Sequence, residues 1–74
     1  MTDTADLVRS WRLRRGLSQA CLAELAGTGQ AAISRIESGR DLPTLAVLER
    51  IALALDCRVA ISFTQNQKGA TSRE

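Results

Sequence analysis

Three glycines divide the first forty residues into short segments, and this spacing limits the possible folds more than any other feature. Gly16, Gly27 and Gly39 each follow a stretch whose apolar residues recur at intervals of three and four. Glycine is favoured just beyond a helix because it adopts the left-handed backbone conformation without steric cost. A chain of 74 residues has room for one modest core. We therefore expect one domain built as a compact cluster of short helices.

The same periodicity predicts four helices. They should cover residues 3–15, 18–26, 30–38 and 44–55, with Ser18 and Thr44 as N-cap residues. The apolar residues at helical spacing are expected to point into the core: Leu7, Val8, Trp11, Leu22, Leu25, Ala26, Ile33, Ile36, Leu45, Leu48, Ile51, Ala52 and Leu55.

After the last helix the period changes to strict alternation. Val59, Ile61 and Phe63 alternate with smaller or polar residues over 58–64, which predicts one half-buried β-strand. A lone strand leaves its backbone groups unpaired, and no other segment offers a partner. We expect it to serve as a dimerisation strand, paired antiparallel with the same strand of a second copy. The alternative is an extended tail that lies on its own helices. Residues 65–74 are polar and are predicted to form a flexible tail.

Several classes of function lack support in the composition. No apolar run approaches the roughly 20 residues of a membrane span, and the polar, acidic start is no signal peptide, so we expect a cytoplasmic protein without membrane contact. The chain has no histidine and only Cys21 and Cys57, so we expect no metal and no cofactor. Both cysteines are expected to be small, buried or half-buried residues. Without a nucleophile–base pair or a Gly-rich phosphate loop, the chain is not expected to be an enzyme.

Basic residues are concentrated in the first half of the chain. Residues 1–40 hold six arginines and four acidic residues, whereas residues 41–74 hold four basic and four acidic ones. The planar fork of arginine suits phosphates and guanine edges. Charge alone leaves nucleic-acid binding and an ordinary solvated helix face equally open.

Residues 19–36 carry the strongest signal. Two short helices joined by a three-residue turn must approach closely, and Ala23 is small enough to allow this. Gly27 permits the positive φ that the turn requires. The apolar residues that fill the angle between the helices are Leu22, Ala26, Ile33 and Ile36. This spacing predicts a helix-turn-helix.

The opposite face of the second of these helices is polar and has no acid at its centre. At about 100° per residue, the outward positions are Gln30, Ala31, Ser34, Arg35 and Ser38. Glutamine can bond an adenine edge, arginine a guanine edge, and serine either, while an alanine methyl can touch that of thymine. This composition favours major-groove readout over a solvated face.

Residues 12–55 resemble the Xre family of Cro/cI-type helix-turn-helix regulators. The resemblance lies in Arg12-Leu-Arg-Arg-Gly-Leu-Ser-Gln19, Leu22-Ala-Glu24, Ile33-Ser-Arg-Ile-Glu-Ser-Gly-Arg40, Pro43-Thr-Leu45 and Leu48-Glu-Arg-Ile-Ala-Leu-Ala-Leu55. It implies an all-α, compact lambda-repressor-like domain of four to five short helices over residues 1–57. It also implies a bacterial or phage-encoded transcription regulator that binds double-stranded DNA, as a homodimer on a palindromic operator.

Carried over by position, the resemblance also implies roles for individual residues. Base edges would be contacted by Gln30, Ala31, Ser34 and Arg35, and phosphates by Gln19, Ser38 and Arg40. Arg12 and Glu37 would form an internal salt bridge. The chain departs from the family at the turn residues Thr28-Gly29, at Cys21 in place of a capping glutamate, and at Asp56, where glycine is common.

The segment after the last helix resembles, in pattern, the C-terminal part of Hip-type antitoxins. That resemblance implies one component of a toxin-antitoxin system, which represses its own operon and binds a kinase toxin. A stand-alone phage-type repressor or a restriction-modification controller remains an alternative. So does a protein-binding adaptor that uses the same fold without DNA.

Overall fold

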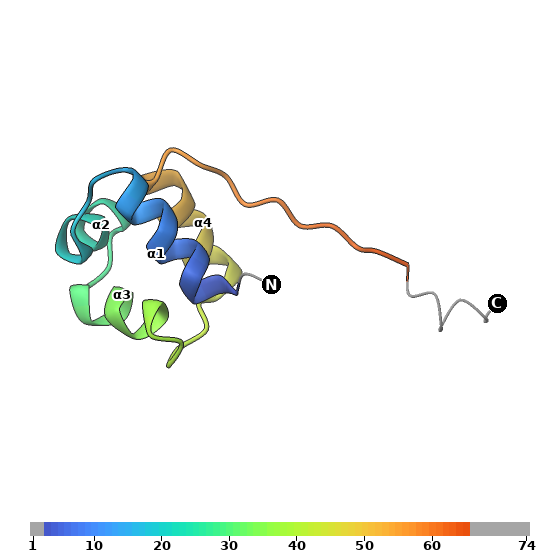
Figure 1. Cartoon of the computed structure of the whole chain (residues 1–74), viewed down its shortest axis with the longest axis horizontal. Coiled ribbons are helices and arrows are strands. Elements are labelled where there is room, and N and C mark those ends of the chain that lie inside the picture. The colour runs from blue at the N-terminus through green and yellow to red at the C-terminus, as the bar shows by residue number, and fades with distance from the viewer. Residues whose placement is uncertain (1–2, 66–74) are drawn as a thin grey trace.

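The computed structural model describes residues 3–65 and consists of four helices (Figure 1). They are α1 (Thr4–Arg14), α2 (Gln19–Ala26), α3 (Gln30–Glu37) and α4 (Leu45–Ala54). This confirms the all-α prediction, and each helix lies within two residues of its predicted bounds. The described residues contain neither a fifth helix nor a strand. Residues 66–74, predicted as most of a flexible tail, lie outside the described residues.

Local capping explains where the helices begin and end. The Ser18 Oγ accepts a hydrogen bond from Cys21 N–H at 3.0 Å, and the Thr44 Oγ1 accepts one from Val47 N–H at 3.2 Å, as expected for N-caps. Gly27, which ends α2, has a φ of 72°, in the left-handed region that glycine favours. The capping residues therefore fix where these helices begin and end.

Eight apolar residues form the core. Leu22, Ile33 and Ile51 are the largest of its fully buried side chains. α2 packs against both α3 and α4, and α1 packs against α3. The complete core is Val8, Leu22, Ala23, Ala26, Ile33, Ile36, Ile51 and Leu55.

Three residues predicted to be buried are exposed. Leu25 lies about 110° around α2 from the centre of the face formed by Leu22, Ala23 and Ala26, because each residue turns the helix by about 100°. Leu45 is the first residue of α4, and Leu7 borders an incompletely filled space between α1 and α4. The choice of face was therefore wrong for Leu25, whereas Leu45 is exposed by its position at the helix end and Leu7 by the unfilled space. Cys21 is exposed as well, and only Cys57 is half-buried.

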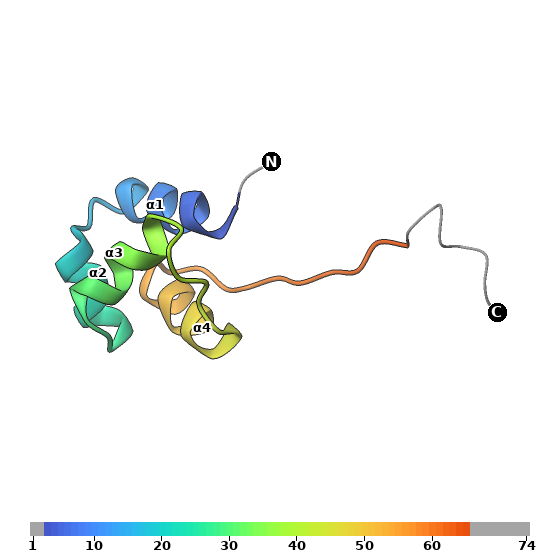
Figure 2. The same ribbon diagram turned by 90° about the horizontal axis from the view of Figure 1, so that it is seen from below.

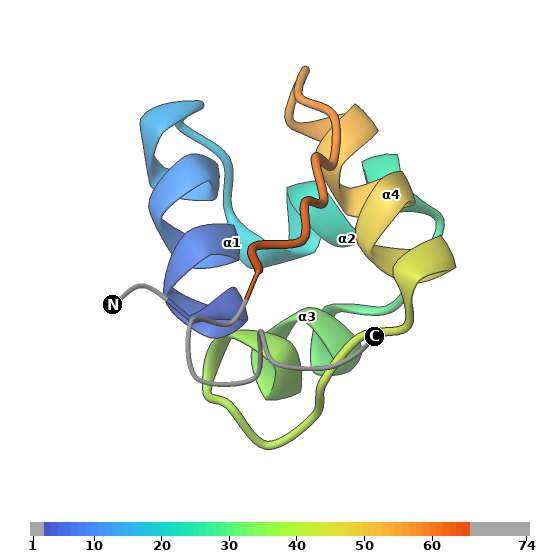
Figure 3. The ribbon, with the colours of Figure 1, turned by 90° about the vertical axis from the view of Figure 1, so that its right-hand side faces the viewer.

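Residues 58–65 leave the helices as an extended segment, at first between α1 and α4 and then away from the body (Figures 1 and 3). The strand predicted over 58–64 is not formed in the single chain, and the described residues supply no hydrogen bonds between this segment and the helices. The reason is physical: a strand needs backbone partners, and every other described segment with regular structure is a helix. Pairing with a second copy stays a prediction. Over residues 3–65, no helix has the length and apolar character that a membrane span requires.

We expect adjacent leucines of α2 to differ sharply in their effect on stability. Leu22 is 0% exposed and Leu25 is 61% exposed. Leu22→Ala should lower the free energy of unfolding by about 2–5 kcal/mol because it leaves a cavity in the core. Leu25→Ala, the matched control, should change it by less than about 0.5 kcal/mol. Urea unfolding measures both values, and equal effects would contradict this assignment of the buried face.

Candidate nucleic-acid interface

The turn between α2 and α3 holds the two helices in a fixed relation. Gly27 adopts positive φ, and the Thr28 N–H donates to the Ala23 carbonyl at 2.9 Å, which closes the turn. Ile33 and Ile36 bury one side of α3. Gly29 is the N-cap of α3 and makes no side-chain cap hydrogen bond. The orientation of α3 therefore depends on its isoleucines and on the turn.

The other side of α3 is open to solvent. Seen from below, α3 lies in front of α2 and no other helix covers it (Figure 2). All five positions predicted to face outward are exposed: Gln30, Ala31, Ser34, Arg35 and Ser38. The structure thus brings together, on one exposed helix face, an amide, a hydroxyl and a guanidinium that can bond base edges.

The loop after α3 binds Arg35 at both its side chain and its backbone. The Arg35 Nε donates to the Asp41 Oδ2 at 2.8 Å. The Arg35 carbonyl accepts hydrogen bonds from Ser38 Oγ at 3.1 Å and from Arg40 N–H at 2.9 Å. The ion pair is about half exposed on both sides and contributes little stability. Its consequence is orientation, because holding Nε restricts the fork while the terminal nitrogens stay available for a ligand.

Gln19, at the start of α2, is bound to the protein by one hydrogen bond. Its Nε2 donates to the Glu37 Oε1 at 3.2 Å. Gln19 is half-buried and stands beside the free N–H groups of the first turn of α2, where anions are favoured. Ser38 and Arg40, the other predicted phosphate contacts, are both exposed in the loop after α3. The three therefore flank α3 from two different elements.

The ion pair between Arg12 and Glu37 is present and joins α1 to the end of α3. Two parallel hydrogen bonds form it, from Arg12 Nε at 2.7 Å and from Arg12 Nη2 at 3.0 Å. The Arg12 Nη1 also donates to the Leu17 carbonyl at 2.8 Å. The two side chains are only 11% and 3% exposed. Such a buried bidentate pair fixes geometry more tightly than a surface pair can.

The electrostatics of this pair follow from its surroundings. Burial raises the pKa of Glu37, but hydrogen bonds from Arg12 and Gln19, and the positive charges of Arg12 and Arg9, outweigh it and leave the pKa below its usual value. The hydrogen bond to Glu37 raises the pKa of Arg12 against the opposing effect of burial. Both groups are therefore charged at neutral pH.

The sequence did not predict the roles of two arginines and one acidic residue. The Arg15 Nε donates to the Leu55 carbonyl at 2.8 Å, and the Arg50 Nε donates to the Ala26 carbonyl at 3.2 Å, so each satisfies a free carbonyl at the end of another helix. Asp41 was missed as the partner of Arg35. Its position six residues after Arg35 was the available signal, but pairing at that separation requires knowledge of the loop. Some of the arginines therefore stabilise the fold and are not free to bind a partner.

Comparison with known proteins agrees with this geometry. The profile of the HTH_3 family, described as helix-turn-helix, matches residues 8–61. The chain is 36% identical over 61 residues to the competence pilus inhibition repressor of Acinetobacter baylyi, which covers 82% of this chain and 56% of that protein. The chain therefore spans little more than half the length of this curated relative.

Two solved structures share the fold. An HTH_3 family transcriptional regulator from Vibrio cholerae is 37% identical with a TM-score of 0.70, over 73% of this chain and 30% of that one. A chain of the SinR protein/SinI protein complex is 28% identical with a TM-score of 0.71, over 76% of this chain and 55% of that one. The similarity in both cases spans most of this chain.

Glu37→Gln should destabilise the protein and flatten its response to acid. At neutral pH we expect a loss of about 3 kcal/mol, because a buried guanidinium loses its counter-ion. Because the pKa of Glu37 is lowered in the folded protein, the ion pair makes its full contribution to the free energy of unfolding at any pH above the usual glutamate pKa of about 4.3. That contribution disappears as pH falls through the native pKa. Urea unfolding from neutral pH down to about pH 3 should therefore show the two proteins converging.

The exposed Glu49 provides the control for this experiment. Glu49→Gln should leave the free energy of unfolding within about 0.5 kcal/mol of the unsubstituted protein at neutral pH. If the Glu37→Gln protein kept a constant difference from the unsubstituted protein at every pH, the ionised pair would not be the source of the stabilisation.

Proposed function

This chain belongs to the HTH_3 helix-turn-helix family of transcriptional regulators, and from this premise we propose that it is a repressor that binds a palindromic operator as a homodimer. The observation that carries the proposal is the exposed face of α3, where Gln30, Ser34 and Arg35 are open to solvent while Ile33 and Ile36 are buried. A helix anchored on one side with hydrogen-bonding side chains on the other is suited to the major groove.

In the proposed complex, α3 reads the base edges. Gln30 bonds an adenine, Arg35 bonds a guanine through its terminal nitrogens, Ser34 bonds either, and Ala31 touches a thymine methyl. Asp41 keeps the Arg35 fork oriented through Nε during this contact. Readout therefore depends on a residue of the following loop as well as on α3.

Phosphate contacts on both sides of α3 set its position in the groove. Gln19 approaches one strand from the start of α2, where the helix dipole also attracts an anion. Ser38 and Arg40 approach from the loop after α3. Such contacts carry affinity without sequence preference, and they make binding depend on salt. In the homodimer, half-sites lie about one helical turn, or a multiple of it, apart.

The second candidate function is that of an antitoxin which represses its own operon and also binds a kinase toxin. The extended, alternating segment over 58–64 supports it, because the resemblance to Hip-type antitoxins lies there. The SinR/SinI complex supports it more generally, since a protein of this fold is in complex with another protein there. A repressor of this type would thus combine DNA binding with a protein partner.

Substitutions on α3 and in the loop should have different signatures in DNA binding. On duplexes selected from a random library, Gln30→Ala and Arg35→Ala should each cost about 1–3 kcal/mol and relax the preference at one base position. Arg40→Ala should weaken binding to all duplexes about equally and reduce its salt dependence. Fluorescence anisotropy across a salt series measures these effects. Unchanged operator affinity in both α3 variants would refute the readout face, and absence of duplex binding at low salt would favour the adaptor.

The antitoxin function is tested by co-expression with a kinase encoded beside this gene. A stable complex that survives affinity purification and size exclusion is expected for an antitoxin. The control partner is an unrelated kinase, which should not co-purify. A chain that represses its operator but never retains the neighbouring kinase is a stand-alone repressor.

A further inference from the structure

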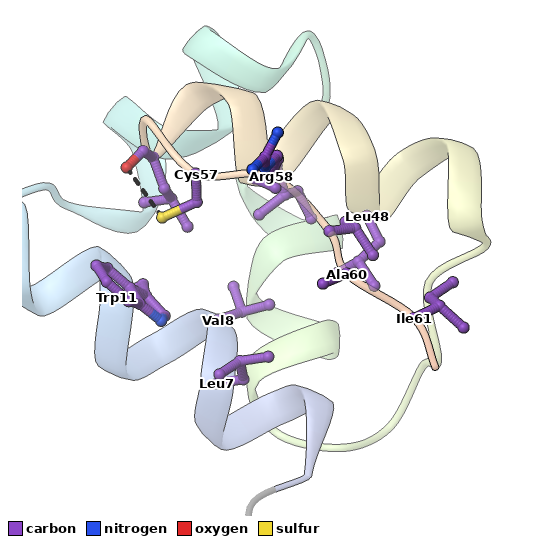
Figure 4. Close-up of a pocket in the computed structure, with 12 residues that line it drawn as sticks. Leu7, Val8, Trp11, Leu48, Cys57, Arg58, Ala60 and Ile61 are labelled. Carbon is purple, nitrogen blue, oxygen red and sulfur yellow. Dashed lines mark hydrogen bonds between the residues drawn. The ribbon is translucent and has the colours of Figure 1, made fainter. Parts of the chain in front are cut away.

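An apolar groove of about 260 Å³ opens between α1 and α4 (Figure 4). It exists because α1 packs on α3 while α4 packs on α2, so α1 and α4 stand apart on the same side of the domain (Figure 3). The helical residues that line it are Leu7, Val8, Trp11, Leu48, Ile51 and Leu55. Leu7 remains 47% exposed there, so the helices alone do not close this side of the core.

The segment after α4 covers only part of the groove. Cys57 and Val59 are half-buried, whereas Arg58 and Ala60 are exposed, so alternate side chains turn toward the groove. The same alternation continues into Ile61, which lines the end of the groove, and into Phe63, which does not line it and is 99% exposed. Figure 4 shows Ala60 and Ile61 on the α4 side, opposite Leu7 and Trp11 of α1. One chain thus holds both an unfilled apolar groove and a large apolar side chain that lies outside it.

We infer that Phe63 of a second copy of this chain fills the groove between α1 and α4. The inference rests on the strand-paired homodimer of the proposed function and specifies what that pairing does. Directly opposed residues of an antiparallel pair point to the same face. If Ile61 faces the partner's Ile61 on the two-fold axis, Val59 stands opposite the partner's Phe63. Because Val59 lines the groove, the partner's Phe63 lies beside it, over the groove.

The backbone disfavours a shift by one residue and a pairing centred on Ala60. A shift by one residue would set the apolar face of one strand against the outward face of the other. A pairing centred on Ala60 would place Phe63 opposite Cys57, whose N–H already donates to the Ala52 carbonyl at 2.7 Å. That pairing would also require Asp56, which has a φ of 60°, to join the ladder. Pairing about Ile61 uses only residues 58–64, none of which makes a hydrogen bond among the described residues.

The lining of the groove fits an aromatic side chain better than a small-molecule ligand. The groove is smaller than the roughly 300–1,000 Å³ of most ligand sites, which also carry convergent polar groups. Here the one charged lining residue is Arg58, which is exposed. Trp11 lines the α1 wall, and the guanidinium groups of Arg14 and Arg15 lie over its ring at 4.6 and 5.2 Å from the centroid, so a phenyl ring would meet the rest of the indole. Two-fold symmetry fills both grooves of the dimer in the same way.

Cysteine cross-linking tests the register in the 74-residue chain carrying Cys21→Ser and Cys57→Ala. Ile61→Cys should form an intermolecular disulfide under mild oxidation, because directly opposed Cα atoms lie about 4.5–5.5 Å apart, within disulfide range. Ala60→Cys, the matched control, should not, because its partner residue is Ser62. Both sites are exposed in the single chain, so neither change threatens its fold. Cross-linking through position 60 in preference to 61 would overturn the inference.

Trp11, the only tryptophan, reports on occupancy of the groove. Its emission should shift to shorter wavelength as rising concentration drives dimerisation. Phe63→Ala should abolish that shift and weaken dimerisation at least about tenfold. Thr64→Ala, on the outward face, should preserve both. Sedimentation is measured without DNA, so the dimer is judged apart from operator binding.

The outcomes separate this inference from the proposed function. A chain that stays monomeric at all concentrations contradicts both the strand-paired homodimer and the filled groove. A dimer that Phe63→Ala leaves equally stable, with Trp11 emission independent of concentration, contradicts the filled groove alone. If the Trp11 emission stays at the shorter wavelength even where the chain is monomeric, the chain's own Phe63 fills the groove. That result also overturns the inference.

Discussion

The rest of this structure depends on the burial of Ile33 in the core. α3 has eight residues, and helices shorter than about 12–15 residues are marginal in water. Its stability must therefore come from tertiary packing, and Ile33, with no exposed surface, supplies the centre of that packing against Leu22 of α2. Because the apolar anchor lies on one side, the opposite side is left to polar residues. The same constraint thus explains both the stability of α3 and the availability of its outer face.

The charged groups divide between holding α3 in place and facing a partner. Arg12 and Arg15 make hydrogen bonds inside the protein, whereas Arg35 and Arg40 lie exposed on and after α3. The Arg12–Glu37 pair connects the last residue of α3 to α1, and Gln19 adds a connection to α2. Arginines that look alike in sequence therefore have different roles: some stabilise the fold and others are exposed to a partner. The small net charge of +2 understates how unevenly positive charge is presented.

Local chemistry made much of the fold predictable. Ser18 and Thr44 begin helices as expected because their hydroxyls accept hydrogen bonds from the first turn, and Gly27 ends one because it tolerates positive φ. Predictions failed where a tertiary choice was required. Leu25 has the same helical spacing as core residues, but α2 turns Ala23 inward instead, since a small residue lets the helices approach. The Asp41 contact depends on the path of a loop, which periodicity does not encode.

The segment over 58–64 is a different case, because its predicted pairing involves a second chain and the single chain does not test it. Within the described residues its alternation is used only in part, because Val59 lines the groove while Phe63 contacts solvent and the backbone groups of 58–64 make no hydrogen bonds. An alternating apolar run costs solubility unless something covers it, and edge pairing with other proteins is the usual hazard. Pairing with a second copy would remove that hazard and close the core between α1 and α4 in one step. The dimer would then be part of how each domain completes its own fold, and the spacing of the two α3 helices on DNA would follow from the same contact.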